Sequence, residues 1–375
     1  MPPALPRLDW MALAPLLIVT ATSFAGVLLD VAPAAERKGV LASVSVLGLA
    51  GAFVVSLLLL GGPARSFQQM LALDDFALFF NLIFCASTGL VLLLSVDYLR
   101  RQDVELGEYY LLVLFAAIGM MLMAGATDLL VVFLGLELMS ISLYVLAGFF
   151  RTRPTGNESG MKYFLLGAFA SGFFLYGIAL LYGATGTTSL ARLGQALAGA
   201  GAARDPMILA GLALLLVGFG FKTSAVPFHQ WAPDVYEGAP TAVAALIATG
   251  SKAAAFAALL RVLIAMQALQ GDWAAVLWVL AVLTMTVGNV AALVQTNLKR
   301  LLAFSSIAHV GYMLVGVTAG LQPGSAAVLF YLAVYSIASV GAFGVILLLE
   351  RTDPEGSEVP KAEGRLKGAR LLAPH

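Results

Sequence analysis

Apolar runs of about 20 residues recur along the whole chain, and this repetition limits the possible folds more than any other feature. Such runs have the length of membrane-spanning helices, and they are too long and too evenly apolar for the alternating strands of a barrel, which span about ten residues. The sequence therefore predicts an all-α integral membrane protein with about eleven spans. The predicted spans are 10–29, 40–60, 75–96, 109–126, 128–150, 161–183, 206–231, 240–269, 273–296, 299–319 and 325–350.

The composition agrees with a lipid bilayer as the main partner of the chain. Hydrophobic residues make up 61% of the sequence and charged residues 11%, against about 45–50% and about 25% in soluble domains. The formal net charge is zero, which argues against binding to nucleic acid. Because Cys85 is the single cysteine and no glycine-rich phosphate loop occurs, we expect no flavin, iron–sulfur cluster, nucleotide or metal on this chain.

The positions of lysine and arginine predict the orientation of the chain. Most of the 21 Lys and Arg residues fall in loops after the odd-numbered spans or in the last segment. The positive-inside rule then places the N-terminus outside and these loops in the cytoplasm. We expect residues 1–350 to form one polytopic transmembrane domain and residues 351–375 to form a cytoplasmic tail.

Four ionisable side chains within the predicted spans stand out as candidates for a function: Glu137, Lys222, Lys252 and His309. A charged Lys or Asp at the bilayer centre costs ~2.5–3.5 kcal/mol on insertion scales, so such residues usually face a polar interior and have a function. Lys252 lies near the middle of its span, where its side chain is farthest from either surface. Histidine, with a free pKa of about 6.5, is suited to passing a proton in either direction.

Three of these residues also have a structural interpretation. Glu137 could form an ion pair that holds two helices together. Lys222 could extend toward lipid headgroups if its span ended there. His309 could be a hydrogen-bonded residue of the helix packing.

Pro227 predicts a break in the seventh span, close to Lys222 and His229. Proline removes one backbone donor and clashes with the carbonyl four residues earlier. Broken helices at membrane depth are typical of ion pathways in transporters. The break therefore favours a transport function.

The ionisable residues predict a path for protons. A buried lysine holds its proton less tightly, and a nearby carboxylate restores the affinity. A Glu137–Lys222 pair could therefore gate a proton, with Lys252 and His309 as the next stations. We expect water and the hydroxyl groups of three residues to bridge these stations: Ser251, Ser305 and Tyr312.

Three segments resemble a known family of membrane subunits. They are residues 133–138 (FLGLEL), 221–241 (FKTSAVPFHQWAPDVYEGAPT) and 297–312 (NLKRLLAFSSIAHVGY). The family is that of the antiporter-like subunits of proton-pumping NADH–quinone oxidoreductase, respiratory complex I. The FHxWxPD core is shared with subunits L and M and with multi-subunit cation/proton antiporters, whereas the VYEGAPT continuation resembles subunit N.

The resemblance implies roles for matching residues. Glu137 would be the glutamate that pairs with Lys222, and Lys252 would be the central lysine of span 8. Lys299 and His309 match polar residues of span 10, and His229 lies within the shared core. The resemblance also implies an antiporter-like fold with two inverted five-helix repeats and a broken helix 7.

The resemblance implies partners and cofactors as well. The partners would be the antiporter-like subunits M and L and the small subunits K, J and A of the membrane arm. NADH, FMN, iron–sulfur clusters and quinone would be bound by other subunits, and quinone reduction there would drive the protons.

The sequence departs from the family pattern at its end. The second repeat is incomplete, and residues 364–375 resemble the stretch that precedes the three final spans of the family. We therefore expect 351–375 to be a linker to further spans. Two alternatives stay open at this point: a subunit of a cation/proton antiporter, and a truncated, non-pumping structural scaffold.

Overall fold

The computed structural model describes residues 9–31, 38–102, 104, 106–199 and 205–350. Within these residues, 11 helices are long and apolar enough to cross a membrane, which confirms the predicted all-α membrane fold. The expected tail at 351–375 lies outside the described residues. The long helices are α1 (Ala14–Val31), α2 (Lys38–Leu59), α3 (Asp75–Arg101), α4 (Gly107–Gly125), α5 (Leu129–Ala147), α6 (Pro154–Thr185), α8 (Pro206–Thr223), α12 (Gln270–Leu293), α13 (Leu298–Thr318) and α14 (Leu321–Leu349), together with the eighth span, Thr241–Ala265.

Shorter elements connect the spans. The eighth span is composite: α10 (Thr241–Leu246), a π-helical turn (Ile247–Ser251) and α11 (Lys252–Ala265). The remaining short elements are two 3₁₀ turns (Trp10–Leu13 and Gln267–Leu269), the helices α7 (Leu190–Leu197) and α9 (Trp231–Gly238), and an antiparallel hairpin of β1 (Arg65–Phe67) and β2 (Leu71–Leu73). The hairpin and α7 were not predicted from the sequence, because both are shorter than the apolar runs that define spans.

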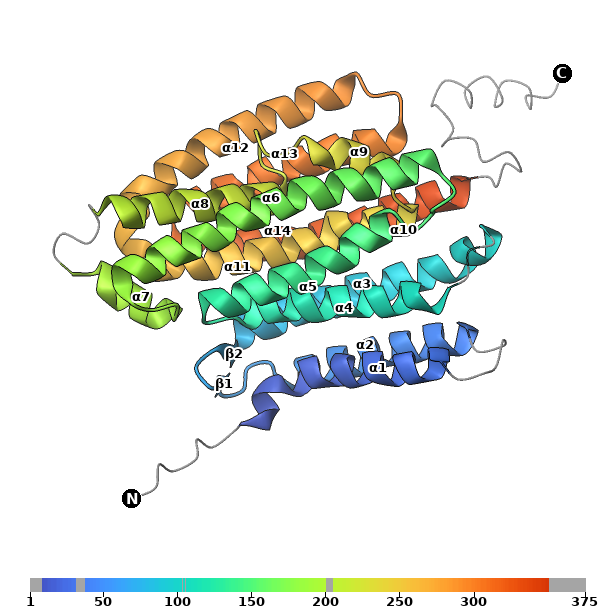
Figure 1. Ribbon diagram of the computed structural model, residues 1–375, viewed down its shortest axis with the longest axis horizontal. Helices are drawn as coiled ribbons and strands as arrows, with labels where there is room; N and C mark the ends of the chain where they lie inside the picture. The colour runs from blue at the N-terminus through green and yellow to red at the C-terminus, as the bar shows by residue number, and fades with distance from the viewer. Residues whose placement is uncertain (1–8, 32–37, 103, 105, 200–204, 351–375) are drawn as a thin grey trace.

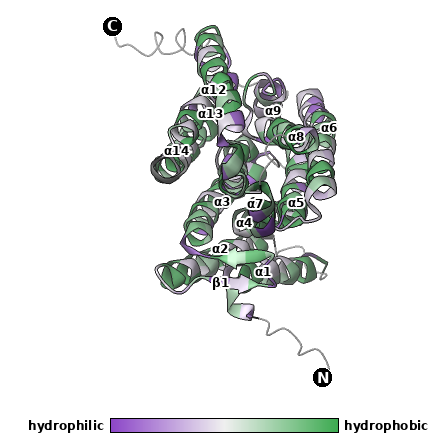
Figure 2. Ribbon diagram, turned by 90° about the vertical axis from the view of Figure 1, so that its left-hand side faces the viewer, coloured by the Kyte–Doolittle hydropathy of each residue, from purple (hydrophilic) through white to green (hydrophobic). Residues whose placement is uncertain are grey.

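The helices run side by side as one bundle, with α1 and α2 at one edge and α12 at the opposite edge (Figure 1). Most of each ribbon is hydrophobic (Figure 2), as expected for helices in contact with lipid. The eighth span lies at the centre of the bundle, and its central 18-residue window is fully buried. Any polar side chain on this span must therefore find its partner within the protein.

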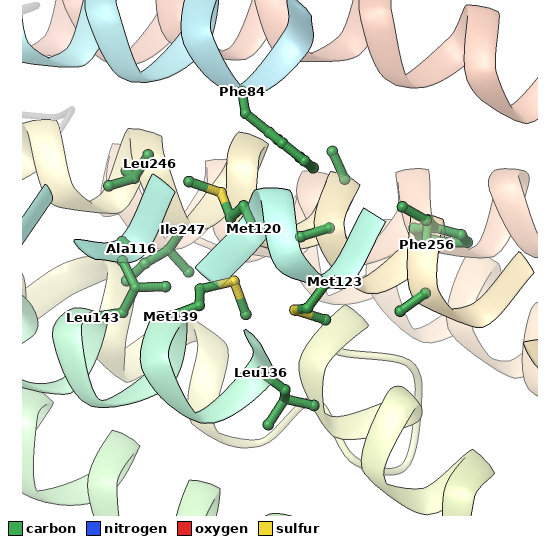
Figure 3. Packing of buried hydrophobic residues seen from close by; sticks show 14 of the residues in the cluster. Phe84, Ala116, Met120, Met123, Leu136, Met139, Leu143, Leu246, Ile247 and Phe256 are labelled. Carbon is green, nitrogen blue, oxygen red and sulfur yellow. The ribbon is translucent and has the colours of Figure 1, made fainter. Parts of the chain in front are cut away.

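Small residues and methionines let α4, α5 and the eighth span approach closely. A side chain at Gly119 of α4 would collide with the backbone of α5 at Gly135, so the two helices touch through glycine. Figure 3 shows Met120 and Met139 between these helices and the eighth span. Methionine is flexible enough to fill such irregular gaps, and Met120 lies against Gly250 of the π-helical turn.

The seventh span is broken, as the sequence predicts. Helix α8 ends at Thr223, Ser224 has a left-handed backbone, and the chain becomes helical again at Trp231 in α9. The freed backbone groups find partners inside the bundle, which membrane depth requires. The N–H of Val226 donates to Thr284 Oγ1 at 3.0 Å, and Trp231 Nε1 donates to the Phe221 carbonyl at 3.0 Å.

The π-helical turn in the eighth span departs from the prediction of an uninterrupted helix at 240–269. It ends at Ser251, directly before Lys252. Such turns are rare and often lie at functional sites. Hydropathy does not reveal them, because every residue of the turn is compatible with a regular helix.

Candidate functional site

Lys222 is the last ionisable residue of α8 before the break, and only 2% of its surface is exposed. Its Nζ donates a hydrogen bond to Tyr144 Oη of α5 at 3.1 Å. The ammonium also lies 5.0 Å from the ring centre of Tyr144, 5.5 Å from that of Tyr163 and 5.8 Å from that of Phe221. Aromatic faces attract a desolvated cation, so Lys222 is held inside the bundle and does not extend toward lipid headgroups.

Lys252 follows the π-helical turn and is 1% exposed. Its Nζ donates to Ser306 Oγ of α13 at 2.5 Å. The same oxygen accepts a hydrogen bond from Tyr335 Oη of α14 at 2.7 Å and lies 3.4 Å from Tyr236 Oη of α9. Ser306 therefore joins the central lysine to three other elements.

The prediction of which hydroxyl groups bridge the stations was partly wrong. Ser306, and not Ser305, contacts Lys252, while Ser305 lines a cavity between α13 and α14. Tyr312 accepts a hydrogen bond from Asn289 of α12 at 2.8 Å, away from Lys252. Neighbouring residues of a helix point about 100° apart, so helix rotation decides which serine faces the lysine.

His309 lies one turn beyond Ser306 on α13 and is half-buried. Its Nδ1 is 2.5 Å from Tyr331 Oη, and its ring centre is 4.9 Å from that of Tyr335. Both tyrosines belong to α14. They line, with Ser306 and His309, the cavity of about 500 Å³ between α13 and α14.

Glu137 does not form the ion pair with Lys222 that the sequence predicts. Among the described residues no ion pair joins these two side chains, and the Glu137 carboxylate accepts a hydrogen bond from Ser171 of α6. The reason lies in helix geometry. Tyr144, which contacts Lys222, is seven residues further along α5, and this is two turns or about 10 Å. Glu137 faces a partly exposed side of the helix, between Leu134 and Ile141.

Lys299 and Arg300 differ sharply in their surroundings. Lys299 is 3% exposed, and its Nζ donates to the Ala239 carbonyl at 2.6 Å, so it does not reach the headgroups. Arg300 forms ion pairs with Asp234 at 2.7 Å and with Glu237 at 2.8 Å. Both carboxylates belong to α9, which α13 therefore holds in place.

Asp234 is the centre of this ionic cluster. It also pairs with Lys162 of α6 at 2.6 Å. Burial alone would raise the pKa of the Asp234 carboxyl, but hydrogen bonds and charge from Lys162 and Arg300 outweigh burial and lower it below its ordinary value. The half-buried His229 lies in the break and has no hydrogen bond to Lys222, Lys252 or Glu137 among the described residues.

The sequence did not reveal the tyrosines of the site. Tyr144, Tyr163, Tyr331 and Tyr335 carry hydroxyl groups within apolar helices, yet aromatic residues are common in membrane spans. The one available signal was the spacing of Tyr331 and Tyr335, four residues apart and thus on one face of α14. Among the described residues no group of His, Cys, Asp and Glu could hold a metal ion.

Known proteins match most of the chain. Residues 126–363 match the family described as "NADH:quinone oxidoreductase/Mrp antiporter, TM". NADH-quinone oxidoreductase subunit N of Trichlorobacter lovleyi is 50% identical over 345 residues, which are 92% of this chain and 71% of that protein.

Solved structures have the same fold. A chain of respiratory complex I from Thermus thermophilus, solved with bound aureothin, is 41% identical to this chain and superposes with a TM-score of 0.74. The match covers 89% of this chain and 70% of the Thermus chain. A chain of an archaeal membrane-bound sulfane sulfur reductase is 26% identical to this chain and superposes with a TM-score of 0.80. The match covers 91% of this chain and 71% of the archaeal chain. The chain therefore belongs to the NADH:quinone oxidoreductase/Mrp antiporter family of transmembrane subunits, and its relatives within that family are called NADH-quinone oxidoreductase subunit N.

Proposed function

We propose that this chain is a proton-translocating membrane subunit of an NADH–quinone oxidoreductase in a bacterial cell membrane. The observation that carries the proposal is the pair of buried lysines, each bonded to a hydroxyl group deep within a bundle of membrane spans. Burying a lysine costs free energy, so lysines buried in membrane spans usually have a function. Lys222, Lys252 and His309 are the stations of the path, and Lys299 and His229 are additional candidates.

Tyr163 and Ser251 support a link between the two lysines. The Tyr163 ring lies 5.5 Å from the Lys222 ammonium, and Ser251 is the neighbour of Lys252 in the chain. Neither hydroxyl forms a hydrogen bond that meets the geometric criteria among the described residues. The Tyr163 and Ser251 hydroxyl groups are nonetheless close neighbours. Buried hydroxyl groups without protein partners commonly bind internal water. Water held there would connect Lys222 to Lys252.

Glu137 acts on Lys222 from a distance in this proposal. Two unit charges about 10 Å apart interact by ~2 kcal/mol at an effective dielectric constant of about 20. The partly exposed Glu137 is also accessible to a neighbouring subunit, so an approaching charge could strengthen or weaken its effect.

The driving energy must come from other subunits. Moving one charge against 100 mV costs ~2.3 kcal/mol, and we place no redox centre on this chain. NADH, FMN, iron–sulfur clusters and quinone are bound elsewhere, and subunits M, L, K, J and A are the proposed neighbours. A subunit of a cation/proton antiporter is the second candidate, because the family description includes Mrp antiporters.

The test uses the assembled complex in membrane vesicles. Lys222→Ala and Lys252→Ala should each lower proton uptake per NADH oxidised, because each removes a station. The rate of NADH oxidation and the pH gradient are measured together, and assembly is checked on native gels. Arg192→Ala, on the exposed side of α7, is the control for a lost cation. Assembled lysine variants that translocate protons at the wild-type ratio would exclude the relay and favour a structural scaffold.

A sodium dependence separates the second candidate. Proton translocation by the oxidoreductase requires NADH and quinone and is independent of sodium. Proton movement that needs an opposing sodium gradient and proceeds without NADH would instead identify an antiporter.

A further inference from the structure

Two tyrosines on one face of α14 connect to the two ionisable groups of the second half of the path, one through Ser306 and one directly. Tyr335 Oη donates to Ser306, which is bonded to Lys252, and Tyr331 Oη contacts His309 Nδ1. The tyrosines are four residues apart, so their side chains lie above one another on the helix. Tyr236 Oη lies 3.4 Å from the same Ser306 oxygen, whereas Tyr312 Oη contacts Asn289 of α12.

Ser306 can pass a proton only if its neighbours can accept one. A serine hydroxyl has one donor and two acceptor positions. In the structure both acceptor positions are used, by Lys252 Nζ and by Tyr335 Oη. A proton that leaves Lys252 for the Ser306 oxygen displaces the serine's own proton, and Tyr335 Oη is the closer of its two phenol neighbours, at 2.7 Å against 3.4 Å for Tyr236.

The cavity between α13 and α14 provides the last step. It is lined by Ser305, Ser306, His309, Tyr331 and Tyr335 among others, and its volume is about 500 Å³. The Tyr335 and His309 rings both border this cavity, and their centres are 4.9 Å apart. The relay requires a water here to connect the phenol to the imidazole.

We propose that Tyr335 is a relay residue that carries protons between Lys252 and His309, and that Tyr331 positions the imidazole for this transfer. The inference rests on the proposed proton translocation. Before the transfer the Tyr335 hydroxyl turns from Ser306 toward the water, so that its oxygen can accept the proton that Ser306 releases. Lys252 then loses one proton, and Ser306, Tyr335 and a water each accept one proton and release one. His309 gains one proton at Nε2 in the tautomer whose Nδ1–H donates to Tyr331 Oη, because that tautomer leaves the Nε2 lone pair free. The hydroxyl groups then rotate back before the next transfer.

The central experiment compares two phenol hydroxyl groups. Tyr335→Phe removes the relay hydroxyl and keeps the ring, whereas Tyr312→Phe removes a hydroxyl that contacts Asn289 on α12. Tyr335→Phe should lower proton translocation about fivefold, the effect of raising a barrier by one ordinary hydrogen bond. Tyr312→Phe should leave it unchanged. Both are measured as protons moved per NADH in the assembled complex, with Lys252→Ala in parallel.

A fluorinated tyrosine at position 335 separates relay from packing. Fluorine makes the phenol more acidic and preserves ring and hydroxyl, so the pH profile of translocation should move toward lower pH while assembly is unchanged. The titratable groups that face Tyr335 are Lys252 of α11, Tyr236 of α9, His309 of α13 and Tyr331 of α14. These groups are the same in the wild-type protein and in the protein with fluorinated tyrosine. A difference between the two pH profiles therefore comes from the phenol at position 335.

The outcomes distinguish this inference from the function on which it rests. If Lys252→Ala abolishes translocation while Tyr335→Phe retains the wild-type ratio, the tyrosine relay is refuted and the lysine path remains. An unchanged pH profile with fluorinated tyrosine also overturns the relay and leaves Tyr335 a packing residue. Normal translocation by Lys252→Ala would refute the proposed function itself.

Discussion

The individual residues of the site differ in how they are stabilised. Lys222 combines one hydroxyl acceptor with three nearby aromatic rings, whereas Lys252 combines one serine oxygen with the single ring of Tyr236 at 6.0 Å. Both environments keep the ammonium away from lipid without a direct carboxylate partner. A lysine bound only by neutral groups can lose its proton at modest cost, which is a property that a relay requires.

The contact between Lys222 and Tyr144 can be broken without changing either residue. A side chain at Gly167 of α6 would collide with the Tyr144 hydroxyl, whereas one at Gly172 of the same helix would meet open space. Gly167→Ala should therefore displace the hydroxyl from Lys222 and lower proton translocation about fivefold, as expected for one lost hydrogen bond. Gly172→Ala is the matched control. Equal translocation by the two variants would show that the Tyr144 hydroxyl is dispensable.

At the scale of elements, α9 links the broken span to its neighbours. Asp234 and Glu237 on α9 pair with Arg300 of α13, and Asp234 also pairs with Lys162 of α6. Tyr236 of the same short helix approaches Ser306. The ionic cluster thus fixes the position of a segment that is too short to be stable alone, and it contributes to the surroundings of Lys252.

The cluster predicts a pH dependence of stability. Because the folded pKa of Asp234 is lowered, its contribution is present above the unfolded value of about 3.9 and is lost as pH falls through the folded pKa. Asp234→Asn should lower the melting temperature of the detergent-solubilised complex at neutral pH and flatten its decline in acid. Glu158→Gln, which affects only the exposed partner of Lys162, is the control. Parallel acid curves for wild type and Asp234→Asn would contradict the assignment.

At the scale of the whole molecule, the central eighth span is held at two points along its length. Lys252 bonds to α13 in its middle, and Arg261 lies near its far end. Arg261 donates to the Ala124 carbonyl of α4 at 2.5 Å and pairs with Asp74, the N-cap of α3, at 2.6 Å. The fully buried span is thereby tied to the α3–α4 layer of the bundle.

Loss of this tie should destabilise the protein without blocking the path. Arg261→Ala removes charge-assisted hydrogen bonds of a largely buried side chain and should cost about 2 kcal/mol. Arg261→Lys should lose less stability than Arg261→Ala, because lysine keeps the positive charge. It should still be less stable than the wild type, because lysine lacks the planar guanidinium group that binds both partners. Thermal melting of the solubilised complex measures both, and protons moved per NADH should stay near wild type. A lowered ratio in a fully assembled Arg261→Lys complex would place Arg261 in the path instead.

Local properties of the sequence determined the membrane fold, the number of spans, the break beside Lys222 and the identity of the buried ionisable residues. Hydropathy and proline act within a few residues, so no contact between helices is needed to interpret them. The orientation, the inverted repeats and the extent of the tail stay predictions. The tertiary structure decided that Tyr144 and not Glu137 binds Lys222, and that Ser306 and not Ser305 binds Lys252. Each choice depends on the rotation and axial shift of whole helices, and packing sets both, since one residue along a helix turns a side chain by about 100°.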